Sequence, residues 1–360
     1  MKSKELCVYL AGILVTALAP GAAFAATNFV QKNLVSDQDA VADNTDPNLA
    51  GSWGISSSPT SPFWVSNLTN GTSTLYDTAG VPNALVVTVP PSAGNQTRPG
   101  SPTGQVQNGL GAFEVAPGKA AFFIFATLDG TISGWNPTVG DGKTAVIKVD
   151  NGGKGSYLGL GIGTSSAGPT LYAANFGAGR IDTFDGNYAP IMLPGGFRDP
   201  NLPVGFSPSN IQRFGRQLYV TYNLPDGHGA FVSGPGMGLV NVYDLDGNLL
   251  QPLIPQSAAL NTPWGIALAG PNFGVFSYAL LVANFGDGTI SAFDPLTGNY
   301  LGTMHDGKGN NLAIDGLWGL IFGNGGNGGD PTALYFAAAP AGGRHGLFGS
   351  LKPATDSNIP

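Results

Sequence analysis

Short apolar runs alternate with turn-forming segments along the whole chain, in a pattern that repeats roughly every 50 to 55 residues. In the fifth copy, the runs at 264–268 and 278–283 are almost continuously apolar, as in strands buried on both faces. The run at 289–293 alternates apolar and polar residues, and the polar run at 299–303 follows a turn. The pattern predicts four antiparallel strands per copy, from an apolar inner strand to a polar outer strand.

Six copies of this unit align on one position near the start of the first strand. That position is occupied by Trp53, Thr103, Leu158, Asn210, Trp264 and Trp318. A fixed period of this size indicates a repeat architecture, and a four-stranded antiparallel repeat is typical of a propeller blade. The sequence therefore predicts an all-β fold, a six-bladed β-propeller with four antiparallel strands per blade. The blades are expected to start near residues 50, 100, 155, 207, 261 and 315.

The sixth copy has too little chain for its fourth strand. After its third strand, near 344–348, only a polar tail at 351–360 follows. A strand-like run stands instead at 29–35, ahead of the first copy. Pairing this run with the last blade would close the ring and remove two free sheet edges. We therefore expect an N-terminal strand to complete blade six.

The first residues have the pattern of a processing signal. Lys2 and Lys4 precede an apolar stretch at 6–18, and an A-x-A cleavage site ends at Ala25. A retained transmembrane anchor is the alternative, but the apolar run is short and ends at Pro20. We expect residues 1–25 to be a signal peptide, residues 26–350 to form the propeller, and the protein to be exported, either periplasmic or secreted.

Charge and cysteine content narrow the classes of partner. The formal net charge is −7 with only 10% charged residues, and no cluster of lysine or arginine is present. This argues against nucleic acid as a partner, and no second apolar run could span a membrane. Cys7 is the only cysteine and would leave with the signal, so the mature chain has no thiol nucleophile. A small molecule, a glycan or a protein remain as possible partners.

Polar residues gather in the loops that a propeller places on one face, namely those before each first strand and those between second and third strands. The ligand-binding candidates there are Asp129, Asn175, Asp226, His228, Asn284, His305 and Asp315. A ring of such oxygens could bind a divalent cation such as calcium. The alternative is turn capping, because Asn recurs at the end of the second strand in several copies. Asp315 and His228 break the repeat, and His228 lies in the longest loop of its type, at 223–237.

Other motifs carry little chemistry. No G-x-S-x-G elbow and no phosphate-binding loop with its lysine is present, and the three histidines have no short metal-binding spacing. Trp53, Trp264 and Trp318 share one position of the repeat. They are interpreted as packing residues between blades, with an aromatic platform for sugars as the alternative.

Four segments carry a resemblance to a known family. They are VSDQ at 35–38, TDPNL at 45–49 with WGI at 53–55, SPTSPFWVS at 58–66, and FATLDGTISGW at 125–135. Over essentially the whole mature chain the sequence resembles an uncharacterised family of exported bacterial proteins, some of which end in a PEP-CTERM sorting segment. The resemblance implies a six-bladed propeller related to NHL-repeat and SMP-30/gluconolactonase-like proteins. It brings no assigned activity, and the sorting segment has no counterpart here.

Two functions follow as hypotheses. The first is a ligand- or protein-binding scaffold that uses the loops at the channel mouth. The alternative is a metal-dependent hydrolase, a lactonase or esterase of the SMP-30-like type, whose cation would polarise a carbonyl group and activate water. That family is expected to supply a glutamate ligand near the start of the first blade. The only glutamate of the mature chain is Glu114, after the first strand of blade two, which favours the scaffold.

Overall fold

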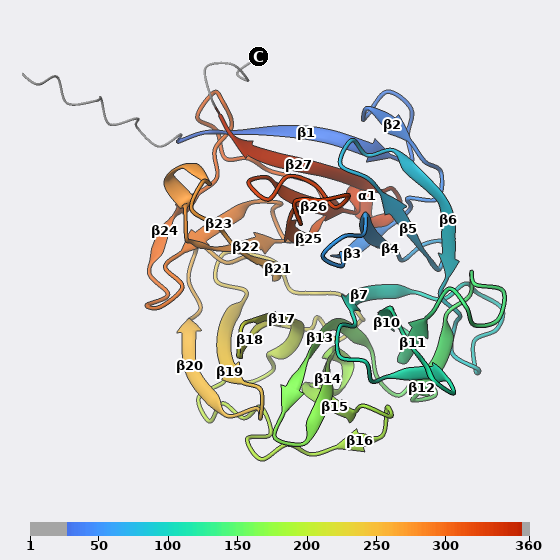
Figure 1. Cartoon of the computed structure of the whole chain (residues 1–360). Coiled ribbons are helices and arrows are strands. Elements are labelled where there is room, and N and C mark those ends of the chain that lie inside the picture. The colour runs from blue at the N-terminus through green and yellow to red at the C-terminus, as the bar shows by residue number, and fades with distance from the viewer. Residues whose placement is uncertain (1–26, 355–360) are drawn as a thin grey trace, which may run out of the picture.

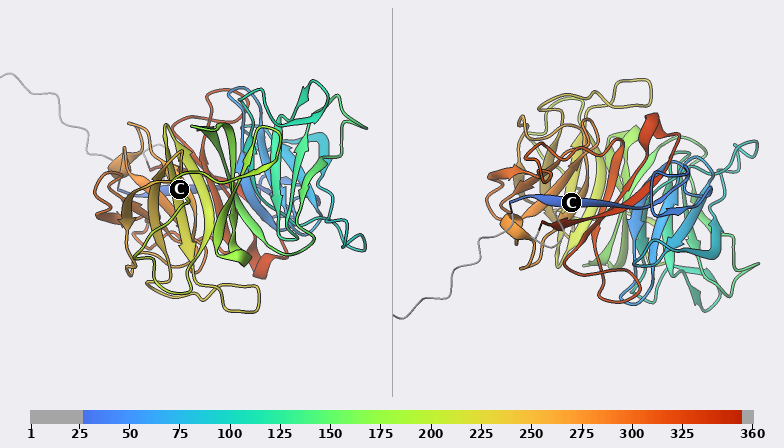
Figure 2. Two further views of the ribbon diagram at one scale, coloured as in Figure 1. Left: turned by 90° about the horizontal axis from the view of Figure 1, so that it is seen from below. Right: turned by 90° about the horizontal axis from the view of Figure 1, so that it is seen from above.

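The computed structural model describes residues 27–354, so the expected signal peptide lies outside the described residues. Six small antiparallel sheets stand around a central axis like the blades of a propeller (Figure 1), and Figure 2 shows the same blades from the side. The predicted six-bladed β-propeller is confirmed. Within residues 27–354, no helix is both long enough and apolar enough to cross a membrane.

Each blade runs from an inner to an outer strand. Blade one holds β3 (Ser52–Ser56), β4 (Phe63–Asn67), β5 (Thr72–Tyr76) and β6 (Pro82–Thr88). Blade two holds β7 (Pro102–Gln107), β10 (Phe123–Thr127), β11 (Thr131–Trp135) and β12 (Val146–Asp150), with a small hairpin of β8 (Glu114–Ala116) and β9 (Lys119–Ala120). Blade three holds β13 (Tyr157–Ser165), β14 (Gly168–Asn175), β15 (Arg180–Asp185) and β16 (Pro190–Ile191).

The second half of the ring follows the same order. Blade four holds β17 (Ser207–Phe214), β18 (Gln217–Asn223), β19 (Leu239–Asp244) and β20 (Leu249–Ile254). Blade five holds β21 (Pro263–Leu268), β22 (Leu280–Asn284), β23 (Ile290–Phe293) and β24 (Tyr300–Thr303). Blade six holds β25 (Leu317–Phe322), β26 (Leu334–Ala338), β27 (Leu347–Pro353) and β1 (Phe29–Ser36). The helical pieces are η1 (Phe176–Ala178), η2 (Gly274–Phe276) and α1 (Pro340–Gly343).

The six inner strands approach one another closely, and this explains the glycine that recurs in the repeat. A Cβ atom on Gly54 would lie 2.4 Å from the carbonyl oxygen of Thr103, and one on Gly265 would lie 2.2 Å from that of Trp318. Any side chain would therefore force neighbouring blades apart. In the copy that lacks the glycine, Asn210 donates its Nδ2 hydrogen to the carbonyl oxygen of Trp264 at 2.9 Å.

The N-terminal strand closes the ring. β1 pairs antiparallel with β27 from Phe29↔Pro353 to Ser36↔Leu347, with one bulge, and β2 (Asn44–Thr45) lies parallel beside β1. Both ends of the described chain thus lie in blade six, at the top of Figure 1. The predicted completion of blade six by an N-terminal strand is confirmed.

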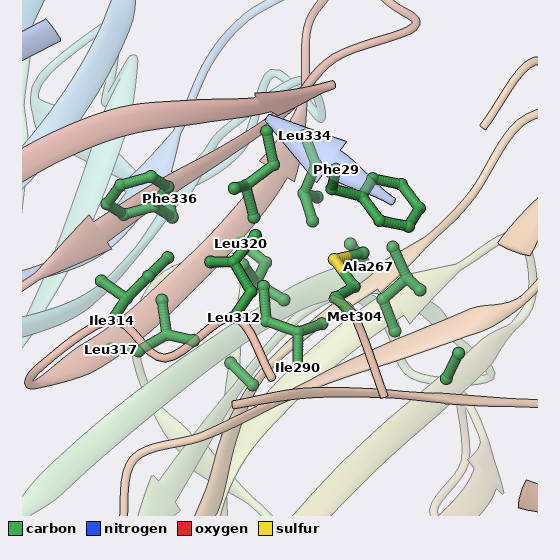
Figure 3. Close-up of a cluster of buried hydrophobic side chains, with 14 of the residues drawn as sticks. Phe29, Ala267, Ile290, Met304, Leu312, Ile314, Leu317, Leu320, Leu334 and Phe336 are labelled. Carbon is green, nitrogen blue, oxygen red and sulfur yellow. The ribbon is translucent and has the colours of Figure 1, made fainter. Parts of the chain in front are cut away.

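Apolar side chains fill the spaces between blades. Figure 3 shows one such cluster, in which Phe29 of β1 lies near Met304 and Leu334. The Phe29 ring also stacks on Phe276 with centroids 5.7 Å apart and contacts Phe273 at 5.0 Å. β1 therefore contributes core packing between blades five and six as well as the outer edge of blade six.

Candidate functional site

Three tryptophans meet where the inner strands begin. Trp53 and Trp318 stack with ring centroids 3.7 Å apart, and Trp264 meets both edge-on at about 6 Å, a distance typical of aromatic pairs. All three are almost fully buried. They come from blades five, six and one, which are neighbours in the ring, so the shared repeat position brings them together at the channel mouth.

A second layer covers the tryptophans, and we call the two layers the aromatic cap. The residue directly after the second strand recurs as a cap member, in Leu68, Leu128, Phe176, Phe285 and Ala339. In blade four, Phe231 of the 223–237 loop takes this place, and its ring lies 5.9 Å from that of Trp318. Phe285 stacks on Trp318 at 4.0 Å. The tryptophan faces are therefore covered by protein, and apolar side chains from all six blades meet on the loop face of the channel.

The channel beneath the cap is narrow. A cavity of 20 Å³ lies between the inner strands, which is room for about one water molecule. Gln105 donates its Nε2 hydrogens to the carbonyl oxygens of Gly54 and Trp64, while its Oε1 is buried without a partner among the described residues. A wider cavity of 240 Å³ opens on the opposite face. The space between the inner strands thus widens away from the aromatic cap.

The asparagines at the ends of the second strands hold turns. Asn284 donates to Ala259 O, Thr289 Oγ1 and Ser291 Oγ, and its Oδ1 accepts the backbone N–H of Asn261 at 3.0 Å. Asn175 accepts the N–H groups of Ser156 and Ala178 and donates to Asp182 at 2.7 Å. These contacts support the capping interpretation for both residues.

The acidic candidates also bind backbone groups. Asp226 accepts the N–H groups of His228 and Ala230, which lower the pKa of its carboxyl group. Asp315 accepts the N–H of Ala341 at 2.8 Å, at the start of α1. Asp129 accepts the N–H of Ser92 at 2.7 Å, while its Oδ1 is buried without a partner among the described residues.

The seven candidates are not joined into one hydrogen-bond network within the described residues. Within residues 27–354, the only hydrogen bond between two of them runs from the His228 N–H to Asp226, inside one turn. His305 contacts β1 instead, since its carbonyl oxygen accepts the N–H of Phe29 at 2.8 Å. The described residues also contain no group of three or more His, Cys, Asp or Glu that could hold a metal ion. A divalent cation such as calcium, held by the Asp and Asn oxygens of these loops, stays a prediction.

The structure reveals a cleft in blade five that sequence reasoning missed. Its volume is 500 Å³, and it lies between the outer part of the blade and the loops before β21 and β25. It is lined by Ser257, Ala258, Ala259, Asp287, Thr289, Ser291, Tyr300, Thr303 and Asn311. Of the predicted residues, Asn284 lies behind its wall, through its bonds to Thr289 and Ser291. The available signal in the sequence was Tyr300, a tyrosine on the predicted outer strand of blade five.

A larger groove of 770 Å³ lies at the outer edge of blade three, between β12 and the segment at 190–198. At its inner end Asp182 accepts the Tyr157 hydroxyl at 3.0 Å and the Arg180 Nε–H at 2.6 Å. Burial, and then the Asp182 charge, raises the pKa of Tyr157. The sequence signal for this groove was the set of four prolines at 190, 194, 200 and 203, in the segment where an outer strand was expected.

Comparison with solved structures shows the fold alone. A streptogramin B lyase superposes with a TM-score of 0.53 at 14% identity, over 92% of this chain and 100% of that chain. A protein of unknown function from Bacteroides thetaiotaomicron gives a TM-score of 0.51 at 12% identity, over 89% and 73% of the two chains. At such low identity the likeness carries no activity to this chain. No family model matches the sequence.

Sequence relatives are found among viral proteins. The uncharacterized protein R648 of Acanthamoeba polyphaga mimivirus is 33% identical over 308 residues, which cover 82% of this chain and 74% of the relative. The uncharacterized protein L690 of the same virus is 32% identical over 330 residues, which cover 88% and 84%. Membership of an exported bacterial group stays a prediction. On the identity and coverage of these two relatives, the chain belongs to the family of the mimivirus proteins R648 and L690, and it folds as a six-bladed β-propeller.

Proposed function

We propose that the protein is an exported binding scaffold that takes a neutral, hydroxyl-rich ligand, such as a glycan, in the blade-five cleft. The observation that carries this proposal is an exposed aromatic ring beside a set of uncharged hydrogen-bonding groups in one cleft. Its volume of 500 Å³ lies within the range of small-molecule sites.

The aromatic ring belongs to Tyr300, which is 53% exposed. Its position is fixed from behind by an edge-to-face contact with Phe293 at 5.7 Å and by a hydrogen bond between its hydroxyl and Thr303 at 2.7 Å. Sugar rings carry C–H groups on their faces and hydroxyls at their edges, so they suit an aromatic ring with polar neighbours.

The polar groups around Tyr300 are mostly uncharged. Ser257 contributes a buried Oγ that has no hydrogen-bond partner among the described residues, and such an atom gains from a ligand hydroxyl. Asp287 is the one carboxylate in the lining. Its Oδ1 accepts from Thr289 and its Oδ2 accepts from Asn261 at 2.9 Å.

This lining favours binding over hydrolysis. General acid–base hydrolysis of a glycoside needs two carboxyl groups on either side of the bond, whereas the cleft offers one carboxylate that is already engaged. The cleft lining also contains no histidine, cysteine or lysine. A rigid ring that presents a cleft without catalytic groups is the expected form of a binding scaffold.

The test is isothermal titration of the mature chain with cellobiose, maltose and chitobiose. We expect at least one disaccharide to bind, and Tyr300→Ala to weaken that binding about two- to twelvefold, since an aromatic contact is worth about 0.5–1.5 kcal/mol. Tyr278→Ala is the matched control, because Tyr278 is also exposed, at 63%, but does not line the cleft. If no disaccharide binds, or both variants weaken it equally, the proposal is wrong.

A further inference from the structure

Blade three lacks most of its outer strand. β16 has two residues and pairs with β15 only at Thr183↔Ile191 and Phe184↔Pro190. In blade two, by contrast, β12 follows β11 from Thr131↔Asp150 to Gly134↔Val146. The first three residues of β15, at 180–182, therefore have no neighbouring strand on their outer side among the described strands.

The missing segment is diverted to blade four. After β16, the backbone N–H groups of Gly195 and Phe197 donate to the carbonyl oxygens of Asp246 and Gly247 in a turn of that blade. The Phe197 ring packs against Tyr243 at 5.2 Å. Pro194 lies in the same stretch and has no N–H to offer a sheet. The open edge is therefore built into the sequence and fixed by packing.

The diversion leaves the groove of 770 Å³ along this edge. One wall comes from Val149 of β12 and the other from the diverted segment, including Leu193 and Phe197. Met192 also lines it and is 98% exposed, which is unusual for a large apolar side chain. The groove thus combines a free strand edge with apolar walls on two sides.

The groove carries two carboxylates and two guanidinium groups, and only the guanidinium groups keep free donors for an acidic occupant. Both carboxylates are occupied: Asp182 accepts three donors, and Asp150 accepts from Ser92, Ala93 and Gly152. Arg198 has no hydrogen bond or ion pair within the described part of the chain, and Arg180 uses only its Nε. The guanidinium nitrogens that remain free are suited to a carboxylate.

We propose that this edge binds an extended segment of a partner protein as an added antiparallel strand, with an acidic side chain of that segment at Arg198. Strand addition uses the free backbone groups of an edge for affinity and flanking pockets for specificity. No other described strand pairs with this edge, so the proposal commits to a separate molecule as the occupant. This site is independent of the blade-five cleft.

The test uses a fluorescent, end-capped hexapeptide of alternating valine and threonine in which one threonine is replaced by glutamate. Two matched peptides carry either glutamine in place of glutamate or N-methyl groups on alternate backbone amides. We expect the parent peptide to raise fluorescence anisotropy on binding and to slow hydrogen exchange at the amides of 180–182. The N-methylated peptide should bind at least about tenfold more weakly, because it cannot complete the ladder.

Variants of the protein test the charge. Arg198→Gln should lower the affinity for the glutamate peptide about two- to fivefold, as expected for the loss of an exposed ion pair. The affinity for the glutamine peptide should stay the same. Arg216→Gln is the control, since Arg216 is also exposed but lies in the turn between β17 and β18. Equal binding of the N-methylated peptide, protection away from 180–182, or absence of binding would overturn the proposal. So would a dimer that already protects 180–182 without peptide, because a second copy would then cover the edge.

Discussion

The aromatic cap is expected to be a main source of stability, and Trp318→Ala tests this. Trp318 is 4% exposed and contacts four other rings: Trp53 at 3.7 Å, Phe285 at 4.0 Å, and Trp264 and Phe231 at just under 6 Å. Removing a buried Trp side chain costs about 3–5 kcal/mol, from lost burial and from the cavity left behind. That is a large part of the roughly 5–15 kcal/mol that holds a typical domain folded.

The assay is urea unfolding followed by circular dichroism, with the near-ultraviolet signal reporting on the stacked rings. Phe231→Ala is the internal control, because Phe231 is only half-buried and should cost about 1–2 kcal/mol. A double-mutant cycle of Trp53→Ala and Trp318→Ala should give an interaction free energy of about 0.5–1.5 kcal/mol, because the two rings stack. A cost below about 1 kcal/mol for Trp318→Ala would refute a structural role for the cap.

Three further predictions concern single polar groups. The rings of Trp64 and Trp135 pack together with centroids 4.9 Å apart. The Trp135 indole N–H donates to the carbonyl oxygen of Gly142, whereas that of Trp64 has no partner among the described residues. In urea unfolding, Trp135→Phe should therefore lower the free energy of unfolding by about 1 kcal/mol more than Trp64→Phe. Asn284→Ala should destabilise the protein by more than Asn67→Ala in the same assay, because Asn284 satisfies both ends of its amide whereas the Asn67 Oδ1 has no partner among the described residues. The hydrogen bond from the Lys352 ammonium group lowers the pKa of Asp330 from 3.8 to about 2. This bond therefore stabilises the fold above about pH 4, and its contribution is lost as the pH falls toward 2. Between pH 5 and pH 2.5, the urea midpoint of Asp330→Asn should fall less than that of the parent protein.

The repeat in the sequence was sufficient to predict the ring. Six copies of an apolar run must solve one packing problem, so the inner strands, the turns and the closing role of residues 29–35 followed from pattern alone. The same logic gave turn capping as the alternative role for Asn284 and Asn175, and the backbone N–H groups that both side chains accept support it.

The sites could not be predicted in the same way, because they arise where the repeat fails. The blade-five cleft depends on the distance between Tyr300 and loops that are remote in sequence, such as the one with Ser257. The blade-three groove depends on where the segment after Ile191 goes, and its contacts with Asp246, Gly247 and Tyr243 of blade four decide that. A sequence pattern shows that a strand is weak, but it does not show what replaces it.

Closing the ring through β1 has a consequence for the order of folding. The β1–β27 ladder joins residues as far apart as Phe29 and Pro353, so β1 cannot pair until β27 has been synthesised. Until then blade six has an open edge, and loop-closure entropy opposes the final pairing. Blades one to five can form as the chain emerges, but the ring becomes a closed unit only after β27 has been made. A truncation of a few residues at the C-terminal end of β27 should therefore act late, by leaving an otherwise folded chain unlocked.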